Sequence, residues 1–258
     1  MTKSTRPRVA FFDFTCCEGC QLTVVDSLQT HPQLLDVVDI VEFREAISGK
    51  AKAYDIAFIE GSCSRVSDEG RLQDIRERAG IVVALGACAH LGGVNAIRNK
   101  QNLEEVRQYV YSAYADWFDV YEVRPISEVI NVDAVVPGCP IDRDEFLTVV
   151  KELLQGRCPE PPDYPVCIEC KLDENVCVFH RGEVCLGPIT RAGCQAICPT
   201  YGSGCVGCRG LIPFPKIESL KQVLAEHGLG RRAIEAKISL YMTNQVQQLV
   251  REEKANGA

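Results

Sequence analysis

The stretch "AYDIAFIEG", residues 53–61, decides the fold class because it is a short, mostly apolar run that ends at a glycine. Such a run is typical of a strand that is buried on both faces of a parallel sheet. Similar runs lie on either side of it along the chain, and amphipathic segments separate them. These runs cover residues 8–15, 37–43, 80–86 and 133–139.

The segments between the runs have the apolar spacing of helices. In residues 68–79 the apolar side chains are Leu72, Ile75 and Ala79, which lie on one helical face. Strands that alternate with helices predict an α/β domain with a doubly wound, five-stranded parallel sheet, flavodoxin-like in its strand order. The other predicted helices cover residues 21–31, 101–118, 145–156 and, in two parts, 218–250, and the aromatic residues of 109–121 are expected in a helix core.

The chain changes character after residue 156. Residues 157–167, "RCPEPPDYPVC", are rich in proline and are typical of a linker. Residues 167–210 are dense in Gly, Pro and Cys and have too little apolar material for a core of their own. We therefore expect two domains, a flavodoxin-like domain over 1–156 and a smaller, loop-rich domain over 157–258.

Composition excludes several classes of function. The net charge is −7 and no basic stripe is present, which argues against nucleic acid as a partner. The first residues contain neither a secretory signal nor a twin-arginine pair, and no run is long enough for a transmembrane segment. These features predict a cytoplasmic protein, in which the 15 cysteines bind metal rather than form disulfides.

Cysteines follow four of the five predicted strands, and the ends of parallel strands meet at one edge of a sheet. Four of these thiols could therefore surround one metal centre, although Cys88 and Cys139 could also be small buried residues. Two carboxylates at this edge, Glu18 and Glu60, could relay protons or serve as ordinary structural groups. The turn after the first predicted strand, "FTCCEGCQLT", contains no phosphate-binding motif, which argues against binding of NAD or FMN by this chain itself. The four thiols belong to Cys17, Cys20, Cys88 and Cys139, and the same edge carries Cys16 and Cys63.

Eight further cysteines follow the linker, enough for two sites with four thiolates each. Their local spacing suits zinc as well as iron–sulfur clusters. A third four-thiolate site at the sheet edge favours iron, because three electron carriers in a row would make a conducting path. The eight are Cys167, Cys170, Cys177, Cys185, Cys194, Cys198, Cys205 and Cys208.

These motifs together resemble the small, electron-transferring, delta-type subunit of cytoplasmic NiFe hydrogenases. The sheet-edge motifs are "CCEGCQLTVVDS", "FIEGSCS", "ALGACAHLGG" and "VVPGCPID", and the C-terminal ones are "CLGPITRAGC" and "ICPTYGSGCVGCRG". With "IECKLDENVC", the sequence is most similar to the NAD(P)-linked and sulfhydrogenase group. The resemblance implies a flavodoxin-like domain with a proximal cluster, then an iron–sulfur domain with two clusters and a helical tail.

The resemblance also implies the ligands of three 4Fe–4S clusters. Many periplasmic relatives have histidine in place of the first distal ligand and proline in place of one medial cysteine. Here these positions are Cys167 and Cys198, which predicts three complete cubanes. The proximal ligands are Cys17, Cys20, Cys88 and Cys139, the medial ones Cys194, Cys198, Cys205 and Cys208, and the distal ones Cys167, Cys170, Cys177 and Cys185.

The implied function is conduction of electrons in a hydrogenase. A large subunit would hold the NiFe centre that turns over H2, and iron–sulfur and flavin subunits with FAD would serve NAD(P), so this chain alone would be inactive. Alternatives are a hydrogenase that serves heterodisulfide reductase or a deazaflavin, a complex I-type subunit, and a zinc-stabilised interaction module. Cys16 stays open as an alternative ligand, Cys63 as a nearby thiol, and Cys158 is expected to be incidental.

Overall fold

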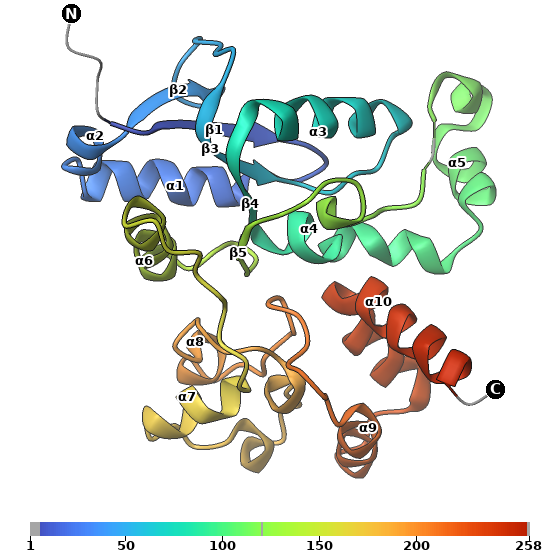
Figure 1. The fold of residues 1–258 in the computed structure, drawn as a ribbon. Helices are drawn as coiled ribbons and strands as arrows, with labels where there is room; N and C mark the ends of the chain where they lie inside the picture. Colours follow the sequence, from blue (N-terminus) through green and yellow to red (C-terminus); the bar gives the residue numbers. More distant parts are fainter. Residues whose placement is uncertain (1–5, 120, 257–258) are drawn as a thin grey trace, which may run out of the picture.

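Five parallel strands form one sheet in the computed structural model, which describes residues 6–119 and 121–256 (Figure 1). The strand order is β2-β1-β3-β4-β5, the flavodoxin-like order, so the predicted fold class is confirmed. Phe58 in the central strand pairs with Phe11 on one side and Val83 on the other. The strands are β1 (Arg8–Asp13), β2 (Asp39–Phe43), β3 (Tyr54–Glu60), β4 (Ala79–Leu85) and β5 (Ala134–Val136).

Helices cover both faces of this sheet (Figure 1). On one face, α1 (Gly19–Thr30) and α6 (Arg143–Leu154) pack against a core in which Phe58 stacks on Phe11 and meets Phe146 edge to face. On the other face, α3 (Val66–Arg78) and α4 (Gly86–Leu91) pack against the second core. The short α2 (Leu34–Val37) precedes β2, and 3-10 turns η1 (Gly93–Lys100) and η3 (Ile126–Glu128) lie beside α4 and before β5.

The predicted helix over 101–118 is shorter than expected, and its aromatic residues are not in a core. Helix α5 (Leu103–Tyr111) ends where Ser112 takes a positive φ, and the 3-10 turn η2 (Ser112–Trp117) follows. Tyr109 is 91% exposed and Trp117 is 77% exposed. The core prediction was wrong because other helices already cover both faces of the sheet, and α5 itself buries no residue.

The cysteine-rich part contains more structure than its sequence indicates. Of the predicted linker over 157–167, residues 157–163 form neither helix nor strand, whereas a helix already begins at Val166. Two short helices, α7 (Val166–Leu172) and α8 (Ile197–Thr200), and the 3-10 turns η4 (Val178–Arg181) and η5 (Gly187–Ile189) follow. A small core of Val166, Val178 and Ala196 includes the thiols of two cysteines, Cys185 and Cys205.

The tail folds back onto this same chain. Helices α9 (Ile217–Glu226) and α10 (Arg231–Asn256) bury Leu224, Ile238 and Met242 with residues of the cysteine-rich part. Asn244 donates hydrogen bonds to the carbonyls of Leu91 and Val123, both at 3.1 Å. The tail therefore joins the two parts of the molecule. None of the described helices has the length and apolar composition for crossing a membrane, and the boundary at residues 156–157 stays a prediction.

Candidate metal centres

Four thiols gather where the strands end, and we call Cys17, Cys20, Cys88 and Cys139 the sheet-edge set. Gly86, which directly follows β4 at a φ of +81°, makes this gathering possible. A Cβ atom at Gly86 would lie 2.4 Å from the Cys20 Sγ, so only glycine leaves room for that sulfur. The topology thus brings together cysteines that are far apart in sequence.

Glu60 at the end of β3 holds the start of α1 in place. Its buried carboxylate accepts hydrogen bonds from the backbone N–H groups of Cys20 at 3.2 Å and Gln21 at 2.9 Å. It does the work of an N-cap, since Glu18 at the N-cap position supplies no capping side chain and instead pairs with Arg44. Both carboxylates thus have structural partners, and the proton-relay role predicted for them stays a prediction.

The sheet-edge thiols lie in surroundings that disfavour isolated thiolates. Burial raises the pKa of Cys88 to about 12, and the neighbouring Cys139, Cys16 and Cys17 contribute to this increase. Burial also raises the pKa of Cys139, whereas a hydrogen bond from the Tyr241 hydroxyl lowers it. Because metal ligands must be deprotonated, these thiols would ionise together only around a positively charged group.

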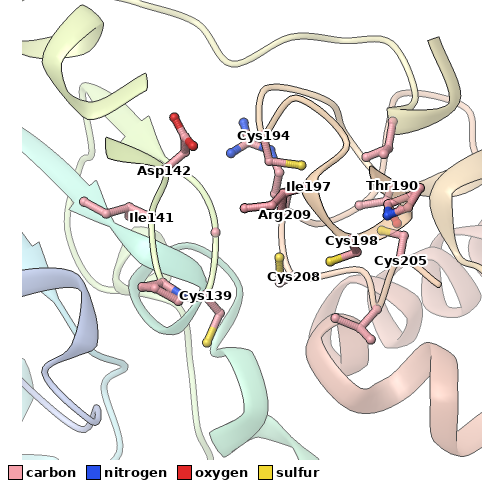
Figure 2. Close-up of a pocket in the computed structure, with 15 residues that line it drawn as sticks. Cys139, Ile141, Asp142, Thr190, Cys194, Ile197, Cys198, Cys205, Cys208 and Arg209 are labelled. Carbon is pink, nitrogen blue, oxygen red and sulfur yellow. The ribbon is translucent and has the colours of Figure 1, made fainter. Parts of the chain in front are cut away.

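A second set of four thiols, Cys194, Cys198, Cys205 and Cys208, faces the sheet-edge Cys139 across a cavity, and we call it the middle set (Figure 2). The cavity has a volume of about 210 Å³. A water molecule takes up roughly 30 Å³, so this space suits an inorganic group of several atoms. Among residues 6–119 and 121–256, no three His, Cys, Asp or Glu side chains converge as they would around one metal ion.

The outer set consists of Cys167, Cys170, Cys177 and Cys185. Burial raises the pKa of Cys167 to about 11, and the other three thiols contribute to this increase, which places all four in one neighbourhood. The Cys185 Sγ also accepts a hydrogen bond from the backbone N–H of Gly187 at 3.3 Å. Such N–H···S bonds stabilise thiolate ligands and tune the potential of the clusters that they hold.

The three sets contact one another in a row. Cys139 of the sheet-edge set and Cys208 of the middle set line the same cavity, and the backbone of Cys139 is close enough to lower the pKa of the Cys208 thiol. The backbone N–H of Cys205, also in the middle set, donates to the Cys185 Sγ in the outer set at 3.2 Å. Cys185 lies near Cys198 as well, so proximity alone does not divide the eight C-terminal cysteines into two groups of four.

The remaining cysteines have different surroundings. Cys16 is half-buried and close enough to Cys88 to raise its pKa. Cys63 is fully buried, and its thiol lies 3.9 Å from the carbonyl oxygen of Arg65. Cys158 is exposed in the linker. Only Cys16 is therefore placed to exchange roles with a sheet-edge thiol.

Four further residues contact the site, and no role was assigned to them from the sequence. Glu169 lies between two outer-set cysteines, and its carboxylate accepts hydrogen bonds from the backbone N–H groups of Gly193 at 2.7 Å and Ala196 at 3.2 Å. Arg209 and Glu145 form a buried ion pair between the two parts of the chain. A charged residue within a cysteine motif was a usable signal for Glu169 and Arg209, whereas nothing in the tail marked Tyr241.

Comparison with known proteins identifies the family. The model of the family described as NADH ubiquinone oxidoreductase, 20 Kd subunit, matches residues 17–153, more than half of the chain. Sulfhydrogenase 2 subunit delta of Pyrococcus furiosus is 35% identical over 231 residues, which are 87% of this chain and 97% of that protein. A subunit of the F420-non-reducing hydrogenase vhu of Methanococcus voltae is 32% identical over 238 residues, 79% of this chain and 82% of its own.

A solved structure agrees with these relatives. A chain of the NAD+-reducing [NiFe]-hydrogenase in the H2-reduced state superposes with a TM-score of 0.55 at 29% identity. The match covers 61% of this chain and 96% of that one. The resemblance expected from the cysteine motifs is confirmed. The chain belongs to the family of the NADH ubiquinone oxidoreductase 20 Kd subunit and, within it, to the small, delta-type subunits of NiFe hydrogenases.

Proposed function

We propose that this chain conducts electrons through three 4Fe–4S clusters that lead away from the NiFe site of a large subunit. The observation that carries the proposal is the row of contacts from Cys139 to Cys208 and from Cys205 to Cys185. Each contact joins a ligand candidate of one set directly to one of the next. Clusters held by adjacent sets would be close neighbours, as electron transfer requires.

In this proposal the sheet-edge set holds the proximal cluster, the middle set the medial cluster and the outer set the distal cluster. The thiols and their N–H···S bonds would anchor the clusters and set their potentials, and the clusters would supply one-electron chemistry. The cavity of about 210 Å³ beside the middle set supports an inorganic group larger than a zinc ion. This volume speaks against the zinc-stabilised module.

The terminal acceptor that we propose is NAD(P), reached through separate iron–sulfur and flavin subunits. The 29% identity to a chain of the NAD+-reducing [NiFe]-hydrogenase supports this acceptor. A complex I-type role is disfavoured because the family model stops at residue 153, before the eight C-terminal cysteines that the chain also carries. Service to a heterodisulfide reductase or to a deazaflavin remains the competing proposal.

The native complex provides the test of this acceptor. Purified with its co-migrating subunits and placed under H2, it should bleach its visible iron–sulfur absorption and then reduce NAD+ or NADP+. Reduction of a heterodisulfide or of a deazaflavin, with no reduction of either pyridine nucleotide, would favour the competing proposal. A complex that shows no bleaching under H2 would contradict conduction by this chain.

We further propose that the exposed aromatic residues around η2 bind the large subunit. Trp117 and Phe118 line a cavity that also contains Thr15 and Ser64. These two polar residues follow β1 and β3, so the aromatic surface lies at the edge of the sheet where the proximal cluster is proposed. The large subunit, whose NiFe site must approach that cluster, is the partner that fits this position.

Trp117→Ser should therefore weaken binding of the large subunit. Loss of one aromatic anchor at an interface costs about 2 kcal/mol, which is roughly a 30-fold rise in Kd. Phe214→Ser is the matched control, since Phe214 is 89% exposed and lies in the C-terminal part. Titration of labelled large subunit measures both variants. Equal affinities for the Trp117 variant and the unmodified chain would refute this interface.

A further inference from the structure

A buried ion pair lies between the sheet-edge and middle sets. The Arg209 side chain is 1% exposed, and two of its guanidinium nitrogens donate to the two carboxylate oxygens of Glu145, both at 2.6 Å. Arg209 Nε also donates to the carbonyl of Ala192 at 2.8 Å, and one terminal nitrogen donates to the carbonyl of Pro137 at 3.0 Å. The guanidinium is thus held from several sides in a fixed orientation.

These contacts tie together the backbone of two cysteine sets. Pro137 is two residues before Cys139 of the sheet-edge set, and Ala192 is two residues before Cys194 of the middle set. Arg209 itself directly follows Cys208, and Figure 2 shows it among the middle-set thiols. A permanent positive charge therefore lies beside one proposed cluster and contacts the backbone within two residues of a ligand of another.

The charge of Arg209 acts on the middle-set thiols. The guanidinium is almost fully buried, so water screens its attraction for negative charge at these thiols only weakly. The same attraction favours any added negative charge at this place, including the electron that a cluster accepts on reduction. Glu145 opposes this effect in part, because its carboxylate neutralises the guanidinium.

We propose that Arg209 is a positioning residue that raises the reduction potential of the medial cluster, with Glu145 limiting the increase. This inference rests on the proposed function, since it presumes a cluster at the middle set. It assigns the pair a role beyond holding the two parts of the chain together. The sign of the effect follows from the charge alone: removal of the arginine charge lowers the potential, and removal of the carboxylate charge raises it.

Charge-changing variants in the intact hydrogenase complex test the proposal by EPR-monitored redox titration. The signal missing from a Cys194→Ala complex identifies the medial cluster, and the distal signal serves as an internal reference. Arg209→Met combined with Glu145→Leu removes both charges and leaves no buried charge unpaired, which favours folding. Because Arg209 lies nearer the middle-set thiols, its loss should dominate, and we expect about a tenfold smaller equilibrium constant for medial reduction, equivalent to about 59 mV for one electron.

Two single variants distinguish the effect of the Arg209 charge from the effect of the contacts that its side chain makes. Arg209→Lys keeps the charge but loses the planar guanidinium. Its equilibrium constant for reduction of the medial cluster should stay within about threefold of the value in the unmodified complex. Glu145→Gln should shift the potential in the opposite direction to the double variant. Arg143→Gln, which breaks the exposed pair with Asp26 and lies on the same helix as Glu145, is the control and should shift nothing.

The outcomes are distinct. A medial potential unchanged in the double variant, or shifts of the same sign in the double variant and Glu145→Gln, would overturn the electrostatic role. Equal disruption by Arg209→Lys and the double variant would also overturn it, in favour of a purely structural clamp. Failure of the proposed function would appear earlier, as the absence of the three cluster signals from the unmodified complex.

Discussion

Replacement of Cys88 by alanine is expected to remove one complete cluster from the hydrogenase complex. The variant should retain about eight iron atoms per chain instead of about twelve, because one of three four-iron clusters loses a ligand. Electron transfer from H2 to any acceptor should fall by roughly 100-fold or more, since loss of even a supporting residue at a metal site costs up to that factor. Iron analysis together with H2-dependent reduction of a dye measures both effects.

Cys63→Ala is the matched control for this experiment. Cys63 lies at the same edge of the sheet and is fully buried, but its thiol contacts the carbonyl of Arg65 rather than the sheet-edge set. We expect full iron content and nearly unchanged activity. If the Cys63 variant loses a cluster and the Cys88 variant keeps all three, the assignment of the proximal ligands is wrong.

Replacement of Gly204 by alanine is expected to disrupt both C-terminal cysteine sets at once. A Cβ atom at Gly204 would lie 1.8 Å from the carbonyl oxygen of Val184, so the backbone itself must move. That movement would separate Cys205 from Cys185, whose hydrogen bond joins the middle and outer sets. Overpacking of this kind costs about 3 kcal/mol, which lowers the unfolding midpoint by roughly 10 °C for a chain of this size.

Gly70→Ala provides the comparison for Gly204→Ala. Gly70 lies in helix α3, and no atom lies within 4 Å of the position of its Cβ. Alanine is favoured over glycine inside a helix by about 0.5–1 kcal/mol, so this variant should be as stable as the unmodified chain or slightly more stable. Thermal unfolding and iron content of the two complexes, measured side by side, show whether a Cβ atom at position 204 destabilises the chain. Retention of all iron by Gly204→Ala would contradict the predicted crowding.

The sheet, and the gathering of cysteines at one of its edges, could be predicted because both depend on local signals. Runs such as residues 53–61 and 80–86 are apolar along most of their length, which is the pattern of strands covered on both faces. Once these strands are parallel, their carboxyl ends share an edge, and cysteines that follow β1, β4 and β5 must meet there. The local pattern and the topology together were therefore enough to predict that the cysteines of the sheet-edge set lie close to one another.

Features that depend on tertiary pairing could not be predicted. Glu145 and Arg209 are 64 residues apart, and the sequence around each residue gives no indication of its partner. The tail helix brings the Tyr241 hydroxyl to Cys139, but its sequence only shows amphipathic spacing. The aromatic residues near Trp117 have helical spacing too, yet they are exposed, because spacing shows which residues share a face and not what that face contacts.

Metal analysis of the intact complex tests most directly whether twelve thiols of this chain hold three four-iron clusters. Iron, acid-labile sulfide and zinc should be measured per copy of this chain, after subtraction of the metals of the other subunits. We expect about twelve iron atoms, about twelve sulfides and no stoichiometric zinc. Four iron atoms or fewer, or zinc in place of iron at the C-terminal cysteines, would contradict this expectation.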